Sequence, residues 1–303
     1  MSIEVRPLAE PDLPEADRIF RLAFGTFVGL PDPMAFAFGA DWVGTRWRAD
    51  PSAILGAYVD GEVAGSNCVV NWGSFGLFGP LTIRPDLWDR GIVTRLLEPT
   101  MDLFTRWGIR QAGLYTFAHS TKHVHLYQKF GFWPQHLTVV MSTAVARVTP
   151  DGHATRFSAD PNLAACRELT YSIYDGLDLE REILAVEGQK LGDTVLVWDG
   201  ARVVGLAVCH CGAGTEAGYD TCYVKFGAAR TARDFDRLLD ACFALAAERS
   251  LARLTAGVNT ARHGAYHRLR ERGFRAEFQG VAMQRPNECG FNRPDAFVLD
   301  DWR

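Results

Sequence analysis

The sequence predicts an α/β (α+β) fold built from two similar domains. Residues 81–132 show hydrophobic patterns in the order strand, glycine-bearing loop, helix, strand and helix. Patterns of the same kind recur about 140 residues later, as is typical of a duplicated domain. A chain of 303 residues is also too long for one small hydrophobic core, which favours two domains.

The composition indicates a soluble globular protein and disfavours several classes of partner. Hydrophobic residues make up 48% of the chain and charged residues 22%. The net charge of −4 and the lack of a basic run disfavour nucleic acid as a partner. No apolar run approaches the ~18 residues of a membrane span, so we expect no membrane partner. Scattered cysteines, seven in all, and a charged start favour the cytoplasm and no secretion signal.

The first eighty residues predict strands and helices that lead into the central stretch. The predicted elements are a strand at 3–6, a helix at 12–24, a helical segment at 42–47, strands at 53–59 and 63–72, and a strand at 75–83. The Asp60-Gly61 pair predicts a tight hairpin turn. Residues 27–40 are rich in aromatic residues, which either line a pocket or serve only as packing, and packing is favoured.

In the central stretch, proline and glycine residues indicate where the predicted strands and helices end. Pro85 ends the strand at residues 81–83 because proline has no N–H to donate. Apolar residues at helical spacing, including Leu96 and Leu97, predict a helix from Ile92 to about residue 107. The further predicted elements are a strand at 111–117, a helix from about 121 that stops at Gly131, and a strand at 136–143.

The start of this helix offers a place for an anion. The first backbone amides of a helix are unpaired and lie at the positive end of its dipole. Residues 89–94 supply such amides, and Gly91 allows a close approach to the backbone. A pyrophosphate would fit there, although glycine before a helix also occurs in ordinary turns.

Two motifs in this stretch resemble those of the GNAT superfamily of acyl-CoA-dependent N-acyltransferases. The family motif runs Val-x-Pro, then Gln/Arg-x-x-Gly-x-Gly/Ala before a helix with paired leucines. Ile83-Arg84-Pro85 matches the Val-x-Pro element, and Gly91 matches the first glycine. Trp88 and Val93 stand at the Gln/Arg and Gly/Ala positions and differ from the family pattern. Residues 126–132, LYQKFGF, are similar to the family's Leu-Tyr-x-Lys-x-Gly-Phe signature.

The resemblance implies a fold, a co-substrate and a reaction. Each domain is expected to be a mixed, mostly antiparallel sheet flanked by helices. Acetyl-CoA is expected to donate an acetyl group to a primary amine of a small molecule by direct attack. The expected contacts to the coenzyme come from Leu81, Thr82, Ile83, Asp89, Arg90, Gly91, Ile92, Val93, Thr94 and Ser120.

The resemblance also implies catalytic roles, each with a structural alternative. Tyr127 matches the tyrosine that donates a proton to the leaving thiolate, although it could instead serve only for packing. The strand at residues 75–80 lacks the carboxylate that many relatives use as a base. His119 is therefore the first candidate for the base, ahead of His123 and His125, because histidine titrates near neutral pH. A structural role is favoured for any one of them, and no carboxylate or cysteine completes a metal site.

The second half of the chain repeats these anchors at similar offsets. Asp60 and Asp199 lie 139 residues apart, Gly65 and Gly205 140, and Leu96 and Leu238 142. The second half has Arg230, Arg233 and Phe235 at the pyrophosphate turn, and Leu269 where the first half has Tyr127. We expect a catalytic domain at 1–145, a linker at 146–160 and a degenerate GNAT-like domain at 161–303 that could complete the acceptor pocket.

Other functions remain open at this point. The missing carboxylate and the altered Trp88 and Val93 also suit a non-catalytic acyl-CoA sensor, or a structural protein without a coenzyme. A longer acyl donor or an oxygen acceptor is a further alternative. Cys209, His210 and Cys211 lie on an alternating strand, so His210 is expected to face away from both cysteines and to serve for packing. The oligomeric state has no sequence signal.

Overall fold

The computed structural model describes residues 2–146, 148–150 and 153–303. Its helices are α1 (Leu13–Phe27), α2 (Val43–Ala49), α3 (Ile92–Arg106), α4 (Thr121–Gln128), α5 (Leu163–Ile173), α6 (Glu180–Gln189), α7 (Ala232–Glu248) and α8 (His263–Glu271). Its strands are β1 (Ile3–Pro7), β2 (Ile54–Val59), β3 (Glu62–Trp72), β4 (Phe75–Ile83), β5 (Gln111–Thr116), β6 (Trp133–Ala144), β7 (Ala154–Arg156), β8 (Gly192–Asp199), β9 (Arg202–Cys211), β10 (Thr221–Ala229), β11 (Arg253–Asn259), β12 (Arg275–Arg285) and β13 (Phe297–Leu299).

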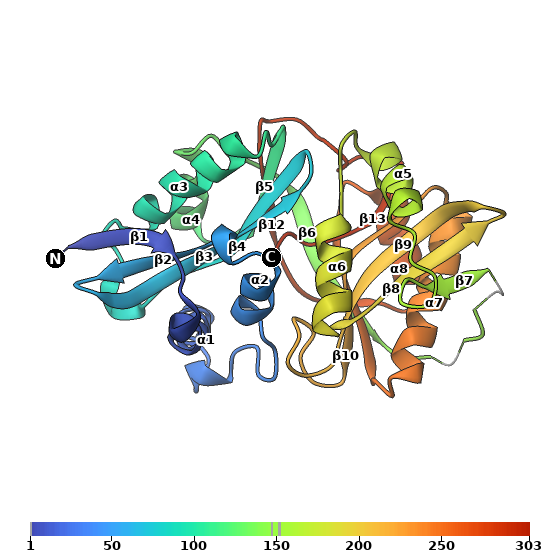
Figure 1. Cartoon of the computed structure of the whole chain (residues 1–303), viewed down its shortest axis with the longest axis horizontal. Helices are drawn as coiled ribbons and strands as arrows, with labels where there is room; N and C mark the ends of the chain where they lie inside the picture. Colours follow the sequence, from blue (N-terminus) through green and yellow to red (C-terminus); the bar gives the residue numbers. More distant parts are fainter. Residues whose placement is uncertain (1, 147, 151–152) are drawn as a thin grey trace.

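The described strands form one continuous sheet that runs through both halves of the molecule. Its order is β1-β2-β3-β4-β5-β12-β6-β11-β10-β9-β8-β7, with β13 paired to β10. Every pairing is antiparallel except β4–β5 and β10–β11. The predicted mixed, mostly antiparallel sheet with flanking helices is confirmed. Figure 1 shows an N-terminal lobe, made of β1–β5 and α1–α4, beside a C-terminal lobe, made of β7–β11, β13 and α5–α8.

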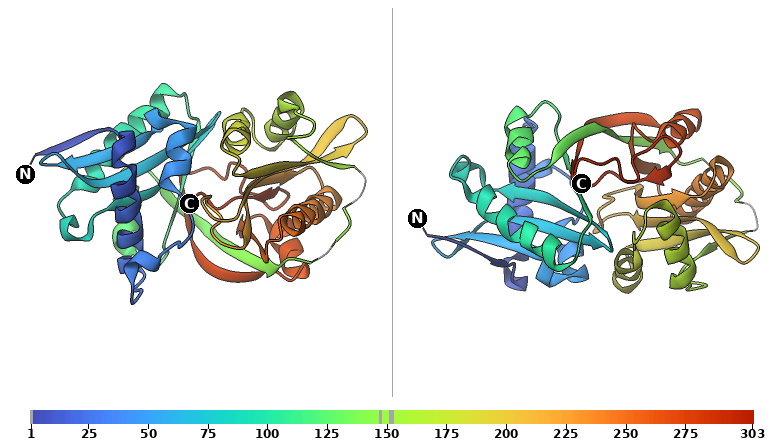
Figure 2. Two further views of the ribbon diagram at one scale, coloured as in Figure 1. Left: turned by 60° about the horizontal axis from the view of Figure 1, so that its bottom comes forward. Right: turned by 90° about the horizontal axis from the view of Figure 1, so that it is seen from above.

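Strands β6 and β12 lie between the lobes, and each pairs with a strand of the lobe that follows or precedes it in the sequence rather than with its own. We call them the exchanged strands. β12 follows α8 of the C-terminal lobe but pairs with β5 of the N-terminal lobe. β6 follows α4 of the N-terminal lobe but pairs with β11 of the C-terminal lobe. The two exchanged strands also pair with each other and run together across the molecule in both views of Figure 2. Each lobe therefore completes its sheet with a strand from the other half of the chain.

Each lobe contains one parallel strand pair that separates part of the way along. In the N-terminal lobe, pairing of β4 with β5 ends at Leu77 and Gly113, although both strands continue. In the C-terminal lobe, pairing of β10 with β11 ends at Val224 and Ala256. There β13 pairs with residues 227–229 of β10 and fills the separation. A parallel strand pair thus separates in both lobes, and a strand, β13, fills the separation in the C-terminal lobe.

The predicted elements of residues 12–132 are confirmed within a few residues. The buried side of α1 carries Ile19 and Phe20, and that of α3 carries Leu96 and Leu97, as their spacing predicts. Helices α5 and α6 were not predicted. The segment predicted as a linker contains β7, which pairs with β8, while residues 147 and 151–152 of that segment lie outside the described residues.

Candidate functional site

The loop before α3 presents the open helix start that the sequence predicts. Gly91 is the N-cap residue, with φ of 76°, and no side chain caps the helix there. Apart from Gly91 and its chain neighbours, no heavy atom of the described residues lies within 4 Å of the position that a Cβ on Gly91 would occupy. Asp89, Arg90 and Gly91 are exposed. The first-turn amides of α3 therefore face open space, where the helix dipole favours an anion.

Trp88, which departs from the family pattern, has a structural role in this loop. Its indole N–H donates to the Ile83 carbonyl at the end of β4, with a nitrogen-to-oxygen distance of 2.8 Å. Asp89 forms an ion pair with Lys122 at the start of α4. The side chain of Val93 is partly buried and packs against the core beneath α3. These contacts hold the loop between β4, α3 and α4.

Tyr127 lies on the buried side of α4, over the strand separation. Its ring centroid is 5.8 Å from that of Phe78, the first β4 residue beyond the part paired with β5. Burial raises the pKa of Tyr127 well above its ordinary value. The phenol therefore keeps its proton at neutral pH, which is the state that a proton donor needs.

The predicted base His119 belongs to a different set of contacts. It is exposed, and its ring stacks on Phe27 of α1 at a centroid distance of 5.9 Å. His123 packs on the same phenylalanine, and its Nδ1 lies 2.9 Å from the Ser120 hydroxyl. Burial, together with Lys122 and His119, lowers the pKa of His123. His119, Ser120 and His123 thus lie together at the end of β5, whereas Tyr127 packs against β4.

Aromatic side chains from both halves of the sequence gather next to the end of β5. Phe24 of α1 stacks on Phe36, and the Phe24 centroid lies 6.4 Å from that of Phe117. Tyr115 on β5 contacts Phe278, which the exchanged strand β12 brings from the second half of the sequence. The Tyr115 hydroxyl is buried and has no hydrogen-bond partner among the described residues. No motif in the sequence identifies Tyr115 as a functional residue, since the alternating pattern of a strand predicts only the face of the sheet on which a side chain lies.

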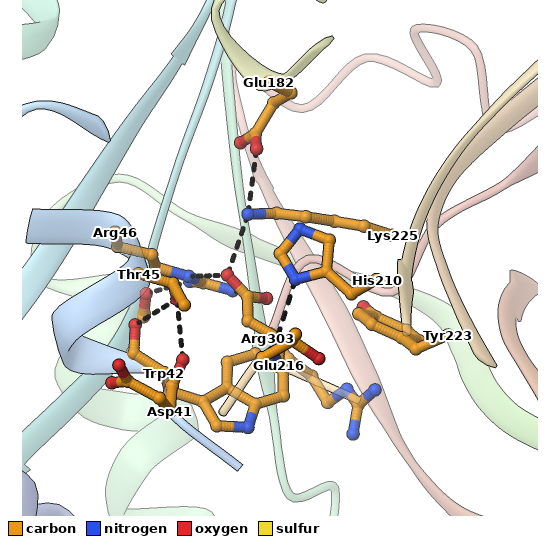
Figure 3. A network of polar contacts seen from close by, with 12 residues as sticks. Asp41, Trp42, Thr45, Arg46, Glu182, His210, Glu216, Tyr223, Lys225 and Arg303 are labelled. Carbon is orange, nitrogen blue, oxygen red and sulfur yellow. Dashed lines mark hydrogen bonds and ion pairs between the residues drawn. The ribbon is translucent and has the colours of Figure 1, made fainter. Parts of the chain in front are cut away.

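A buried network of charges joins the two lobes, as Figure 3 shows. Arg46 of α2 pairs with Glu216 from the β9–β10 loop, with nitrogen-to-oxygen distances of 2.9 and 2.8 Å. Lys225 of β10 lies 2.8 Å from Glu216 and 2.9 Å from Glu182 of α6. The indole N–H of Trp72 donates to Glu182 at 3.0 Å. The four charged side chains are almost fully buried, and their formal charges cancel.

The network keeps its carboxylates ionised despite their burial. Burial alone would raise the pKa of Glu216, but Arg46 and Lys225 together lower it well below its ordinary value. The pKa of Glu182 is lowered by the same balance, because Lys225 and the hydrogen bond from Trp72 together outweigh its burial and its repulsion from Glu216. A buried ion pair of this kind is stable only while every partner is present.

Arg46 also connects this network to a bulge in β4. The pairing of β3 with β4 shifts so that Val69 faces Phe78 while Asn67 faces Leu81, which leaves two β4 residues opposite one on β3. Gly79 is one of these two residues, and its carbonyl accepts a hydrogen bond from Arg46. The Gly79-Pro80 pair within a strand was the available sequence signal for the bulge. The sequence gave no signal for Arg46.

His210 lies in the same region, on the face that the alternation of its strand predicts. Cys209 packs in the core beside α7, while His210 faces the charged network, so the predicted opposition is confirmed. The sequence predicted only a packing role for His210, but its Nδ1 also accepts a hydrogen bond from the Glu216 backbone N–H at 3.3 Å. Burial lowers the pKa of His210 to about 4. His210 also lines a cavity of about 40 Å³ between the lobes, together with Asn71, Glu182, Glu216 and Lys225.

The corresponding helix start in the C-terminal lobe is closed. Thr231 caps α7 by accepting from the Asp234 backbone N–H, and its hydroxyl donates to the Asp234 carboxylate at 2.6 Å. Arg230 is held by Glu168 and Ser172, so it does not point into an anion site. Phe235 packs against Phe297 of β13 at a centroid distance of 5.7 Å. A carboxylate and an inserted strand therefore occupy the positions that are open around Gly91.

Two wider properties of the described residues bear on function. No group of three or more histidine, cysteine, aspartate or glutamate side chains is placed to hold a metal ion within residues 2–146, 148–150 and 153–303. No helix in the described part of the chain is both long and apolar enough to cross a membrane.

Comparisons with solved structures reveal the same fold over the whole chain. A candidate acetyltransferase from Pyrococcus horikoshii matches with a TM-score of 0.71 and 14% identity, covering 99% of this chain and 95% of its own. A GCN5-related N-acetyltransferase from Sphaerobacter thermophilus matches with a TM-score of 0.61 and 17% identity, covering 93% and 95%. At these identities the likeness establishes the fold alone.

Comparisons with known sequences match a smaller part of the chain than the comparisons with solved structures. No curated protein matches the chain. The acetyltransferase (GNAT) family model matches residues 16–132, which include the loop at Gly91, α3, α4 and Tyr127. Residues 16–132 of this chain are therefore similar to the acetyltransferase (GNAT) family.

Proposed function

We propose that the protein is an N-acetyltransferase that transfers an acetyl group from acetyl-CoA to a primary amine of a small molecule. The observation that carries this proposal is the contrast between the two helix starts. The amides before α3 are open at Gly91, beside a separation of β4 from β5 that no described strand fills, although the main chain of Arg303 reaches it at Gly79. The equivalent opening in the C-terminal lobe is closed by Asp234 and filled by β13.

The coenzyme would bind along this opening with its diphosphate at the start of α3. The amides of residues 89–94 would bind the diphosphate there, and Ser120, the N-cap residue of α4, would border it. The main chain of Leu81, Thr82 and Ile83, on β4 beyond the bulge, would hold the pantetheine arm and polarise the thioester carbonyl. The acetyl group would then lie near Gly79, with the acceptor arriving from the side of Tyr115.

The reaction would be a direct attack on the thioester. The amine nitrogen forms a bond to the carbonyl carbon, and the carbon–sulfur bond breaks in the next step. Tyr127 donates its proton to the departing thiolate, and the amine releases a proton to a base. His119 is our proposed base, acting through water because its ring is exposed and packs on Phe27.

Residues 161–303, which form most of the C-terminal lobe and strand β12, would be a degenerate GNAT-like domain that supports the first one. Its element order repeats that of the N-terminal lobe, and its own coenzyme opening is filled. It supplies β12, which pairs with β5 of the N-terminal lobe. It also supplies Glu216, which pairs with Arg46, the residue that binds the carbonyl of the β4 bulge. A lone N-terminal domain would lack both contributions.

Calorimetry with acetyl-CoA, combined with thiol release over a panel of amines, tests this function. We expect one coenzyme bound per chain and thiol release that depends on a primary amine. Binding without thiol release for any amine would instead favour the non-catalytic acyl-CoA sensor. Two bound coenzymes per chain would contradict the degenerate role of the C-terminal lobe.

A further inference from the structure

The guanidinium of Arg303 lies inside an aromatic cage formed by both halves of the sequence. Its central carbon is 5.2 Å from the ring centroids of Trp42 and Tyr223 and 5.1 Å from that of Phe278. Trp42 precedes α2, Tyr223 lies on β10, and Phe278 lies on the exchanged strand β12. Figure 3 shows Arg303 near Trp42 and Tyr223, below the buried charge network. Aromatic faces arranged in this way bind cations.

A carboxylate completes the cage. Asp301 is buried and pairs with the Arg303 guanidinium at 2.9 Å. It also accepts a hydrogen bond from the Tyr223 hydroxyl at 3.0 Å. Burial lowers the pKa of Arg303, but Asp301 and Tyr223 together outweigh burial and the net shift of the pKa is upward. The three rings and this carboxylate therefore select a positive charge.

The side chain of Arg303 spans the distance between the cage and the expected site of acyl transfer. The carbonyl carbon of Arg303 is 3.4 Å from the position that a Cβ on Gly79 would occupy. Gly79 belongs to the β4 bulge, and its carbonyl accepts from Arg46. Burial raises the pKa of Tyr115, whose buried hydroxyl has no partner among the described residues, while the charge of Arg303 lowers this pKa and that of Asp301 raises it. The main chain of Arg303 thus lies at the bulge while its guanidinium fills the cage.

We propose that this cage, formed by Trp42, Tyr223, Phe278 and Asp301, is the subsite for a second cationic group of the acceptor. This inference rests on the proposed function and names the class of acceptor. The acceptor carries a primary amine and, about one arginine side chain away, a guanidinium or ammonium group. Arg303 occupies the subsite as an internal mimic of that group and leaves when the acceptor binds. Residues 300–303 belong to no helix or strand, so its departure breaks no regular element.

Binding of agmatine, a primary amine with a guanidinium four carbons away, tests the proposal. Pentylamine is the matched probe, with the same amine and an apolar end. Calorimetry without coenzyme compares the wild type with Arg303→Ala, in which the cage is vacated. We expect Arg303→Ala to bind agmatine at least about 10-fold more tightly than the wild type. The substitution removes the guanidinium that competes for the cage, whose binding free energy includes at least one cation–π contact. Pentylamine is expected to bind both proteins equally weakly.

A second substitution identifies the cage as the cause. In the Arg303→Ala background, Trp42→Leu is expected to remove the gain in agmatine affinity. Trp133→Leu is the matched control, because Trp133 lies exposed on β6, away from the cage. If Arg303→Ala does not fold, Arg303→Gln replaces it, since glutamine keeps polar volume but no charge. Arg303→Lys retains a cation and is expected to behave like the wild type.

The outcomes separate this inference from the proposed function. Equal affinities of agmatine and pentylamine for folded Arg303→Ala, or unchanged agmatine affinity relative to the wild type, would overturn the cage as a cation subsite. The readout needs no acetyl-CoA and no turnover. A protein without acetyltransferase activity that still shows the agmatine gain would refute the function while keeping the subsite.

Discussion

Arg46 and Glu216 lie 170 positions apart in the chain and form a buried, two-pronged ion pair between the lobes. Their nitrogen-to-oxygen distances are 2.9 and 2.8 Å, and both side chains are almost fully buried. The remaining Arg46 nitrogen donates to the carbonyl of Gly79 in the β4 bulge. A carboxylate of the second half of the sequence thereby orients the arginine that holds the proposed reaction site.

Replacing Glu216 by glutamine is expected to destabilise the protein strongly. The substitution leaves Arg46 and Lys225 buried without their shared counter-charge, a loss of about 3–5 kcal/mol in the free energy of unfolding. Urea unfolding measures this change. Glu15→Gln is the matched control, because Glu15 forms an exposed pair with Arg18 on α1 and should cost no more than about 1 kcal/mol. Similar losses for both variants would show that the buried network contributes no special stability.

His210 is expected to make the stability of the protein fall on mild acidification. Its folded-state pKa of about 4 lies below its ordinary value of 6.5, so the folded protein binds fewer protons than the unfolded chain between these pH values. Its contribution is constant above pH 6.5 and decreases as the pH falls towards 4, by roughly 3 kcal/mol. Below its ordinary pKa of 4.5, protonation of Glu216 acts in the same direction.

The substitution His210→Asn tests this assignment. Asparagine keeps an acceptor for the Glu216 backbone N–H but does not titrate. Melting temperatures measured from pH 4 to 7 should depend less on pH in this variant than in the wild type. His267, which is exposed on α8, provides the control variant His267→Gln. An unaltered pH profile in His210→Asn would assign the acid sensitivity to other groups.

Gly91→Trp is expected to abolish binding of acetyl-CoA. A tryptophan there would place a large side chain beside the open amides of α3 and would strain a backbone with φ of 76°. Gly108→Trp is a close control for that strain, because Gly108 follows the same helix with φ of 67° and also has no neighbour within 4 Å. Calorimetry with acetyl-CoA should detect binding to Gly108→Trp but not to Gly91→Trp. Equal coenzyme affinities would place the diphosphate elsewhere.

Tyr127→Phe is expected to lower kcat while coenzyme affinity stays nearly constant. The phenylalanine keeps the packing against Phe78 but removes the proton proposed to reach the thiolate, and a general acid contributes about 10²-fold or more. Thiol-release kinetics and calorimetry measure the two quantities separately. Tyr171→Phe, at an exposed tyrosine of α5, should change neither. Normal turnover by Tyr127→Phe would refute the acid role.

The local pattern of the chain was sufficient for most of the elements around the proposed coenzyme site. The strand at 75–83, the helix from Ile92 and the helix from residue 121 are confirmed, because each depends on hydrophobic spacing and a nearby proline or glycine. Gly91 could be identified as a helix start for the same reason. Helices α5 and α6 were missed, since their apolar spacing is interrupted by charged and small residues.

The residues around the acceptor side could not be found from local patterns. Arg46, Glu216, Tyr223 and Phe278 come from four segments that share no motif, and the exchange of β6 and β12 brings Phe278 to its position. Strand pairing over such separations is decided by which sheet edges remain open and by how much apolar surface each pairing buries. Local spacing carries neither quantity.

The sequence by itself determined most of the helices and strands around the proposed coenzyme site and the open loop at Gly91, because these follow from residue spacing and backbone preference. Only the tertiary structure decided that the two halves share one sheet, that β13 fills the second opening and that a cage surrounds Arg303. These features depend on contacts between distant segments. Burial and charge neutralisation select such contacts only once the whole chain has packed.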